Sequence, residues 1–301
     1  MIDIVNNDII LNDIDSLLEP NPINTIFFSL KKIWDLNKNN IPENYRIGEK
    51  LSHKFELLIY DLYSEIYDIL IHQIKANEKI NTVLQKEEYC LVIMDGMSLR
   101  EIPSVLNELS HYNIEYNYAY SNVPSTTEHF TKKYFDSRAP STIKSCEKYT
   151  YYYLNREDKI NEIPKDEDKL VIWSTQPDKH FSNFTSSFEL YDLEELGIIT
   201  SRIIKRITEH LEKFNEIIIT SDHGYFVDLY SWEGINDFPS SDRYANYIPK
   251  FLKQYCKYVD DFYVLYGRFN TIKRGKYFHI RHGGLSFLET IVPFIRIKRG
   301  D

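Results

Sequence analysis

YCLVIMD (89–95), KLVIWST (169–175) and EIIITSD (216–222) are three short apolar runs, two of which end in an acidic residue. A strand buried on both faces of a parallel sheet carries such a continuous apolar run, because helices cover both of its sides. Helical periodicity lies between the runs, most clearly in Leu196, Ile199, Ile203, Ile207 and Leu211. The alternation predicts an α/β fold, in which helices cover the faces of a sheet.

Shorter signals predict the remaining elements of this region. Ser98 is a candidate N-cap, because a serine oxygen can accept a hydrogen bond from the first turn of the helix that follows it. The expected elements are a helix from Ser98 through Leu109, a strand at 114–120, a helix from 125–127 through Phe135, a strand at 263–267, and a short helix and terminal strand within LSFLETIVPF (285–294).

The first part of the chain, to about residue 85, predicts helices. One segment spaces its apolar residues at intervals near 3.6, in Leu51, Phe55, Leu58, Leu62, Ile66 and Ile69. Such a stripe could bind a partner or a second copy, or it could pack against the chain's own α/β domain, and we expect the latter. The predicted organisation is an N-terminal helical segment (1–85) and an α/β domain (86–301) with insertions near 137–168 and 232–258.

Composition and charge exclude several classes of protein. The chain has 301 residues and a formal net charge of −9, which opposes broad electrostatic attachment to nucleic acid or anionic membranes. Recognition of phosphate must therefore be local. No stretch approaches the roughly 20 apolar residues of a membrane span, and the acidic start lacks the basic flank of a signal peptide, so we expect a cytoplasmic protein. Cys90, Cys146 and Cys256 form no CxxC pair, so neither a disulfide framework nor a thiolate zinc site is expected.

Acids and a histidine follow two of the apolar runs. TSDHG (220–224) places Asp222 and His223 directly after a buried strand, and Gly224 allows the backbone to turn there. Asp95 ends another such run, in MDG. A carboxylate and an imidazole together suit zinc or manganese. The alternatives are a chance DHG tripeptide and, for Asp95, a cap on the helix that begins near Ser98.

Two further motifs complete the candidate chemistry. NVPSTTEHF (122–130) places hydroxyls at a helix start, where backbone N–H groups favour anions and where a hydroxyl could attack phosphorus if a metal lowered its pKa. The alternative is an ordinary N-cap. RHGG (281–284) places His282 before two glycines, which implies a close approach of the backbone to a neighbouring group.

MDG, PSTTE, SDHG and HGGLS, in this order and at these separations, resemble the alkaline phosphatase superfamily, and the last motif resembles its PglZ-domain branch. The resemblance covers residues from about 88 to 296 and leaves out the N-terminal helices. It implies a three-layer α/β/α fold. It also implies a metal-dependent phosphoesterase, and PglZ proteins are associated with bacterial phage defence and with signalling regulators.

The resemblance also implies a role for each motif residue. Asp95, Asp222 and His223 would hold one metal, which also contacts the nucleophile. Thr127, three residues after Pro124, is the expected nucleophile, with Thr126 as the alternative. The second metal would take Asp178, His180 and His282, although relatives space the first two ligands by four residues and this chain by two.

Basic residues cluster just before His282, in KRGKYFHIRH. They could grip a nucleotide phosphate or simply form a soluble surface. The candidate substrate-binding residues are Arg274, Lys276 and Arg281, with Lys273 beside them and Lys132 and Lys133 as weaker candidates.

The function that follows is hydrolysis of phosphodiesters, of nucleotides or oligonucleotides, through a threonine nucleophile and two divalent metal ions. Zinc is the first expectation and manganese the second, because oxygen and nitrogen ligands accept both. A sulfatase would need a Cys or Ser nucleophile in a CxPxR-like context, which does not occur in the sequence. The alternative is a scaffold without catalysis, kept as a metal-binding subunit of a defence complex with protein partners.

Overall fold

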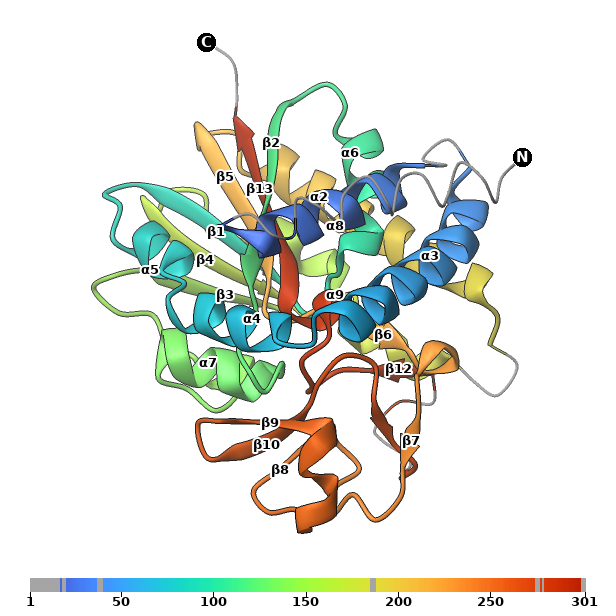
Figure 1. The fold of residues 1–301 in the computed structure, drawn as a ribbon. Coiled ribbons are helices and arrows are strands. Elements are labelled where there is room, and N and C mark those ends of the chain that lie inside the picture. Colours follow the sequence, from blue (N-terminus) through green and yellow to red (C-terminus); the bar gives the residue numbers. More distant parts are fainter. Residues whose placement is uncertain are drawn as a thin grey trace.

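The main sheet is the centre of the molecule (Figure 1). The computed structural model describes residues 17, 20–36, 40–184, 188–273, 277 and 279–298. Six strands lie in the order β2-β13-β5-β1-β4-β3, and only β13 runs antiparallel to its neighbours. Their bounds are β1 (Tyr89–Met94), β2 (Asn113–Tyr120), β3 (Thr150–Leu154), β4 (Lys169–Ser174), β5 (Glu216–Ser221) and β13 (Ile291–Lys298).

The three predicted apolar runs form neighbouring parallel strands. Every residue of β1 is buried, as are all but the first residue of β4 and of β5. Met94, the last residue of β1, is in register with Ser174 of β4 and Ser221 of β5. The carboxyl ends of the three strands therefore meet at one edge of the sheet, which is where ligands bind in open α/β folds.

Helices cover both faces of the sheet. On one face Val92 packs in the same cluster as Ile203 and Ile207 of α8, whereas on the other face Ile93 packs with Phe130 of α7. Successive residues of β1 thus point to opposite layers, as the pleat of a strand requires. The three-layer α/β/α prediction is confirmed, with α6 (Ile102–Glu108) and α8 (Glu194–His210) on one face, and α5 (Lys79–Leu84) and α7 (Thr127–Phe135) on the other.

The described part of residues 1–85 contains α2 (Pro22–Asp35), α3 (Ile41–Leu62) and α4 (Ile66–Lys75), followed by α5 on the face of the sheet. Asn21 and Asn40 cap α2 and α3 with their side chains, and a proline follows within the first turn of each. The apolar stripe expected to be one helix is divided between α3 and α4. Leu62, at the end of α3, is 61% exposed, and so does not belong to the buried stripe.

These helices pack against the α/β domain. The ring of Phe27 lies 5.5 Å from that of Tyr116 and 4.7 Å from that of Tyr118, both in β2. Buried residues of α2, α3 and α4 belong to one hydrophobic cluster with residues of the C-terminal part of the chain. The structure therefore has the packing that we expected for the stripe, while the division of the chain at residue 85 stays a prediction.

The two expected insertions differ in structure. Residues 137–168 contain β3, which pairs in parallel with β4 at the edge of the main sheet, so this segment is not only an insertion. Its sequence, TYYYL, lacks the aliphatic run of the central strands because an edge strand is only half-buried. Residues 232–258 lead into a small three-stranded sheet, the lower lobe in Figure 1, which also contains the predicted strand near 263–267.

The lobe and the return to the main sheet complete the fold. The remaining strands and α-helix are β6 (Phe226–Val227), β7 (Gly234–Ile235), β8 (Tyr244–Ala245), β9 (Cys256–Val259), β10 (Phe262–Leu265), β11 (Asn270–Thr271), β12 (Ile280–Arg281) and α9 (Phe287–Thr290). Short 3₁₀ segments are η2 (Leu99–Glu101), η3 (Pro140–Thr142), η4 (Glu157–Glu162), η5 (Asp178–Asn183), η6 (Leu190–Leu193), η7 (Asp228–Tyr230) and η8 (Lys250–Tyr255). Within the described ranges, no helix has the length and apolarity to cross a bilayer.

Candidate active site

Three acidic residues lie at the carboxyl ends of the three central strands. Asp95 follows β1, Asp222 follows β5, and Asp178 begins the 3₁₀ segment η5 after β4. The backbone N–H of Asp178 donates to the carbonyl of Asp95 over 2.9 Å. Residues that are far apart in the sequence are therefore brought together by strand order, as the three apolar runs predicted.

Asp95, Asp222 and His223 form a first cluster, in which one ligand atom of each lies within 4.8 Å of the others. Nε2 of His223 is 3.6 Å from a carboxylate oxygen of Asp222 and 3.8 Å from one of Asp95. Nδ1 of His223 lies 3.0 Å from the carbonyl of Gly224, so it carries the proton and the lone pair is on Nε2. Two carboxylates at this separation repel each other unless a cation or a proton lies between them.

Thr127 directs its hydroxyl into this cluster. It is the first residue of α7, and its Oγ1 donates to Asp222 over 2.7 Å. The same oxygen is 3.3 Å from Nε2 of His223 and 3.4 Å from Asp95. Thr126 is instead the N-cap of α7, with its hydroxyl 2.7 Å from Nδ1 of His129. Both interpretations of the motif therefore apply, each to a different residue. Thr126 is the N-cap of the helix, and Thr127 places its hydroxyl in the cluster.

Asp178 and His282 form a second cluster together with His223. Nε2 of His282 is 4.0 Å from a carboxylate oxygen of Asp178, and its ring stacks on that of His223 at a centroid distance of 4.2 Å. Nδ1 of His282 lies 3.4 Å from the carbonyl of Ser125, which places the lone pair on Nε2, toward Asp178. His223 is common to both clusters, so the two candidate sites are adjacent.

His180 is the predicted ligand that the structure does not bring to either cluster. Its Nε2 is 2.8 Å from a carboxylate oxygen of Glu195 in α8, and its Nδ1 is 3.2 Å from the side-chain amide of Asn183. Residues three apart lie on the same side of a 3₁₀ segment, so His180, two positions after Asp178 at the start of η5, points to a different side. The prediction of His180 as a ligand therefore gains no support.

Two aromatic residues that the sequence did not single out donate to the acids. The hydroxyl of Tyr277 donates to Asp178 over 2.5 Å, and the indole N–H of Trp173 donates to Asp95 over 3.2 Å. Burial, and then the charge of Asp178, raises the pKa of Tyr277 well above its usual range, so the phenol keeps its proton. A single Trp in an otherwise aliphatic strand was the only signal for Trp173.

The predicted phosphate-binding cations are less available than their sequence suggests. Arg281 is 10% exposed at its side chain and pairs with Asp228 over 3.4 Å. Lys273 donates to the carbonyl of Pro239 over 3.0 Å, and Lys132 pairs with Glu128 over 2.8 Å. Lys133 lies over the ring of Tyr134. Arg274 and Lys276 lie outside the described residues.

Position 224 requires glycine because the backbone of another segment lies very close to it. A left-handed conformation is not the reason, since Gly224 does not adopt one. A side chain at this position would collide with the carbonyl of Leu288, which precedes Glu289 in α9. We expect Gly224→Ala to lower the free energy of unfolding by about 1–3 kcal/mol, because a backbone carbonyl cannot move aside as a flexible side chain can. Chemical denaturation measures this change.

Gly234→Ala is the matched control for that substitution. The group that its side chain would meet is the exposed side chain of Ile272, which can rotate away. Equal destabilisation by the two substitutions would show that the contact with Leu288 does not constrain the loop after His223.

The donor set fits a divalent cation. Its members are carboxylate oxygens and imidazole nitrogens whose lone pairs face one another, which is the chemistry that zinc and manganese accept. A threonine hydroxyl lies against the first of two adjacent clusters. The fold and this arrangement define an α/β protein with a candidate two-metal centre at the carboxyl edge of its sheet.

Among solved structures, the fold resembles murine ectonucleotide pyrophosphatase/phosphodiesterase 5, in one case an inactive form in complex with AMP. Each of these two structures matches with a TM-score of 0.44 and 11% identity, over 70% of this chain and 88% of the other. These values mark a distant likeness, and the site geometry stands independently of it. No protein-family model and no curated protein matches the chain, so the resemblance to PglZ domains remains a prediction.

Proposed function

We propose that the chain is a metal-dependent phosphodiesterase in which the hydroxyl of Thr127 attacks phosphorus. The observation that carries this proposal is the position of Thr127 Oγ1, within 3.4 Å of all three residues of the first cluster. A cap or a surface threonine has no need of two carboxylates and an imidazole around its hydroxyl. A nucleophile that must lose its proton at neutral pH does need such surroundings.

Each residue of the two clusters then has a role. Asp95, Asp222 and His223 would hold one cation, and Asp178 and His282 the other, with His223 within reach of both. Bound divalent cations lower the pKa of a hydroxyl and stabilise the charge that develops on a transferred phosphoryl group. Zinc is the first candidate for both positions. Trp173 and Tyr277 donate hydrogen bonds to Asp95 and Asp178 and so hold the orientation of these two carboxylates.

The reaction would proceed in two displacements. In the first, Thr127 Oγ1 loses its proton to solvent and forms a bond to phosphorus, while the bond from phosphorus to the leaving oxygen breaks with its electrons on that oxygen; Asp222, 2.7 Å from Oγ1, would hold the cation that lowers the pKa of the hydroxyl. In the second, the oxygen of a water molecule bonds to phosphorus as the bond between phosphorus and Thr127 Oγ1 breaks. The water gives up a proton, Oγ1 regains one, and the phosphate monoester leaves. The N-terminus of α7, where Thr127 is located, presents backbone N–H groups that favour the negative charge of the phosphoryl group.

The choice of a diester comes from the sequence, since the proline-threonine motif resembles that of phosphodiesterases more than that of monoesterases. Nucleotides or oligonucleotides are the substrates that this resemblance favours. A role in phage defence or in signalling, with protein partners, likewise stays a prediction from the motifs.

Substitution of the two threonines tests the proposed function. With bis-(p-nitrophenyl) phosphate as substrate, we expect Thr127→Ala to lower kcat by about three orders of magnitude or more, as removal of a nucleophile does. Thr126→Ala is the matched control, because it removes a neighbouring hydroxyl whose loss costs only a helix cap of about 1 kcal/mol. Equal activity of Thr127→Ala and wild type would exclude Thr127 as the nucleophile, and preference for the monoester would exclude a diesterase.

A scaffold without catalysis is the second candidate, and the position of His180 favours it. Since this histidine pairs with Glu195, the second cluster has two residues of its own, Asp178 and His282, and shares His223 with the first. Metal analysis of the purified protein separates the two functions. Two tightly bound ions with Thr127-dependent hydrolysis support the enzyme, whereas one ion or fewer and no hydrolysis support the scaffold.

A further inference from the structure

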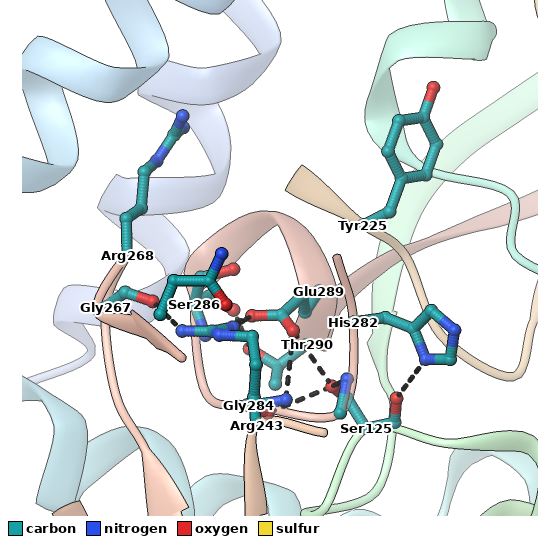
Figure 2. Close-up of polar contacts among 12 residues, drawn as sticks. Ser125, Tyr225, Arg243, Gly267, Arg268, His282, Gly284, Ser286, Glu289 and Thr290 are labelled. Atoms are coloured by element: carbon teal, nitrogen blue, oxygen red, sulfur yellow. Dashed lines mark hydrogen bonds and ion pairs between the residues drawn. The ribbon is translucent and has the colours of Figure 1, made fainter. Parts of the chain in front are cut away.

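The short helix α9 (Phe287–Thr290) touches the loops that carry the candidate catalytic residues. The backbone carbonyl of Glu289 accepts the N–H of Gly224, the residue after His223, over 2.9 Å. The carboxylate of Glu289, which is fully buried, faces the loops of Ser125 and Gly284 (Figure 2). One residue outside both clusters thus contacts all three loops.

The carboxylate of Glu289 is held at both oxygens. Oε1 accepts the N–H of Gly284 over 2.9 Å and lies 3.5 Å from the hydroxyl of Ser125. Oε2 accepts the N–H of Ser286 over 3.0 Å and pairs with the guanidinium of Arg243. The orientation of this side chain is therefore fixed, and it fixes in turn the backbone two residues after His282.

Ser125 connects the loop of His282 to the loop of Thr127. Its hydroxyl, which is fully buried, donates to the carbonyl of Gly284 and accepts the N–H of Gly283, each over 2.9 Å. Its own carbonyl is the partner of Nδ1 of His282 at 3.4 Å. Because Ser125 lies two residues before Thr127, these bonds set the distance between the hydroxyl in the first cluster and the imidazole in the second.

Arg243 extends the connection to the small lobe. This arginine is 1% exposed, and besides Glu289 it donates to the carbonyl of Gly267 over 2.6 Å and to that of Phe269 over 2.8 Å. A side chain on Gly284 would collide with its guanidinium, so the second glycine of HGG makes room for it. The close approach predicted for the glycine pair is thus an approach of Arg243 to Gly284, whereas Gly283 adopts a positive φ of 97° that favours glycine.

The simplest alternative is that Ser286 and Glu289 form an ordinary capping box, with Arg243 as the counter-ion of a buried acid. A capping box satisfies backbone groups of its own helix. It does not account for the bonds that Glu289 and Ser125 make to Gly284, Gly283 and Gly224, all of which lie beside candidate ligands. Because those bonds join α9 and Ser125 to other loops, capping of α9 alone does not explain them.

We propose that Ser125 and Glu289 are positioning residues, which hold Thr127, His223 and His282 in one arrangement, and that Arg243 ties the small lobe to that arrangement. This inference rests on the proposed function for its effect on catalysis. Its effect on metal affinity does not require hydrolysis, because it concerns only where His282 lies relative to Asp178.

Ser125→Ala is the test, with Thr290→Val as the matched control. Both remove one hydroxyl from a fully buried side chain, but among the described residues the hydroxyl of Thr290 donates only to the carbonyl of Ser286, the N-cap residue of α9. Zinc binding to the metal-stripped proteins is measured by calorimetry, together with thermal unfolding and hydrolysis of bis-(p-nitrophenyl) phosphate. Glu289→Gln, which keeps the shape of the side chain and removes its charge, is the second variant if Ser125→Ala does not fold.

We expect Ser125→Ala to weaken one of two zinc sites by about 10- to 100-fold and to lower kcat by a similar factor with little change in KM, as loss of a group that orients ligands does. Thr290→Val should lower the unfolding temperature without either effect. Equal zinc affinity in the two variants, or no zinc binding by wild type, would overturn the inference. Zinc binding that changes as expected in a wild type without diesterase activity would instead count against the proposed function alone.

Discussion

Asp222→Asn is expected to remove one bound metal ion and to lower kcat/KM for the diester by about 10³-fold, since metal stabilisation of the transition state amounts to several kcal/mol. Asp222 is fully buried, and its Oδ1 already accepts the N–H groups of Gly96 and His223 over 3.0 and 2.9 Å. Its Oδ2 faces Thr127. Asparagine retains the shape of the side chain but lacks the negative charge that offsets a cation. The variant should therefore fold but should not bind this metal ion.

The effect of zinc on stability gives this prediction a second readout. A ligand that binds only the folded state raises its stability according to concentration and affinity. Zinc should therefore raise the unfolding temperature of the wild type and of Asp260→Asn, which alters an exposed acid paired with Lys75. It should raise that of Asp222→Asn much less. An equal rise in all three proteins would mean that Asp222 holds no metal.

Glu56→Ala should lower the free energy of unfolding by about 3 kcal/mol, the lower end of the cost of breaking a buried ion pair, because Glu49 stays 3.8 Å from the guanidinium of Arg268. Glu56 lies in α3 and accepts Nε of Arg268 over 2.9 Å and the N–H of Phe287, the first residue of α9, over 2.8 Å. Both side chains of the ion pair are almost fully buried. Burial raises the pKa of Glu56, although the charge of Arg268 opposes that shift. The ion pair therefore contributes little more to stability than an apolar pair of the same size would, whereas the loss of one partner is costly.

Asp260→Asn is the control for this effect, because it removes the charge of an exposed acid from an ion pair and keeps a residue type that tolerates the left-handed backbone of this position, so it should change stability by no more than about 0.5 kcal/mol. Urea denaturation compares the two. If Glu56→Ala were no more destabilising than Asp260→Asn, the N-terminal helices would be an appendage rather than a part of the core that holds α9.

The acidic residues at the carboxyl ends of the strands could be predicted from the sequence. The second cluster could be predicted only in part. Asp95 and Asp222 follow continuous apolar runs, and such runs are a strong local signal for parallel strands whose carboxyl ends meet. The expectation for Thr127 came from the resemblance to phosphodiesterases, which place the threonine three residues after a proline, here Pro124. The side to which His180 points could not be predicted from the sequence, because it depends on a 3₁₀ turn and on a contact with Glu195 in α8.

Contacts between residues that are far apart in the sequence could hardly be predicted from the sequence. Arg243 and Glu289 are 46 positions apart, and Ser125 and Glu289 are 164 apart, so neither contact produces a periodicity. Edge strand β3 was missed for a related reason, since a half-buried strand needs no aliphatic run. The S-x-x-E spacing of Ser286 and Glu289, within an apolar stretch, was the one local sign that a charged residue would be buried there.

Identification of the group that becomes covalently attached to the enzyme tests the central claim most directly. Wild-type protein is mixed with bis-(p-nitrophenyl) phosphate in the presence of zinc, quenched in acid within a turnover, digested, and analysed by mass spectrometry. Attack by Thr127 predicts a p-nitrophenyl phosphoryl group on that residue, with release of one p-nitrophenolate, and none on Thr127→Ala. Hydrolysis without a modified residue, or the same group on Thr126 or another side chain, would contradict the assignment of Thr127 as the nucleophile.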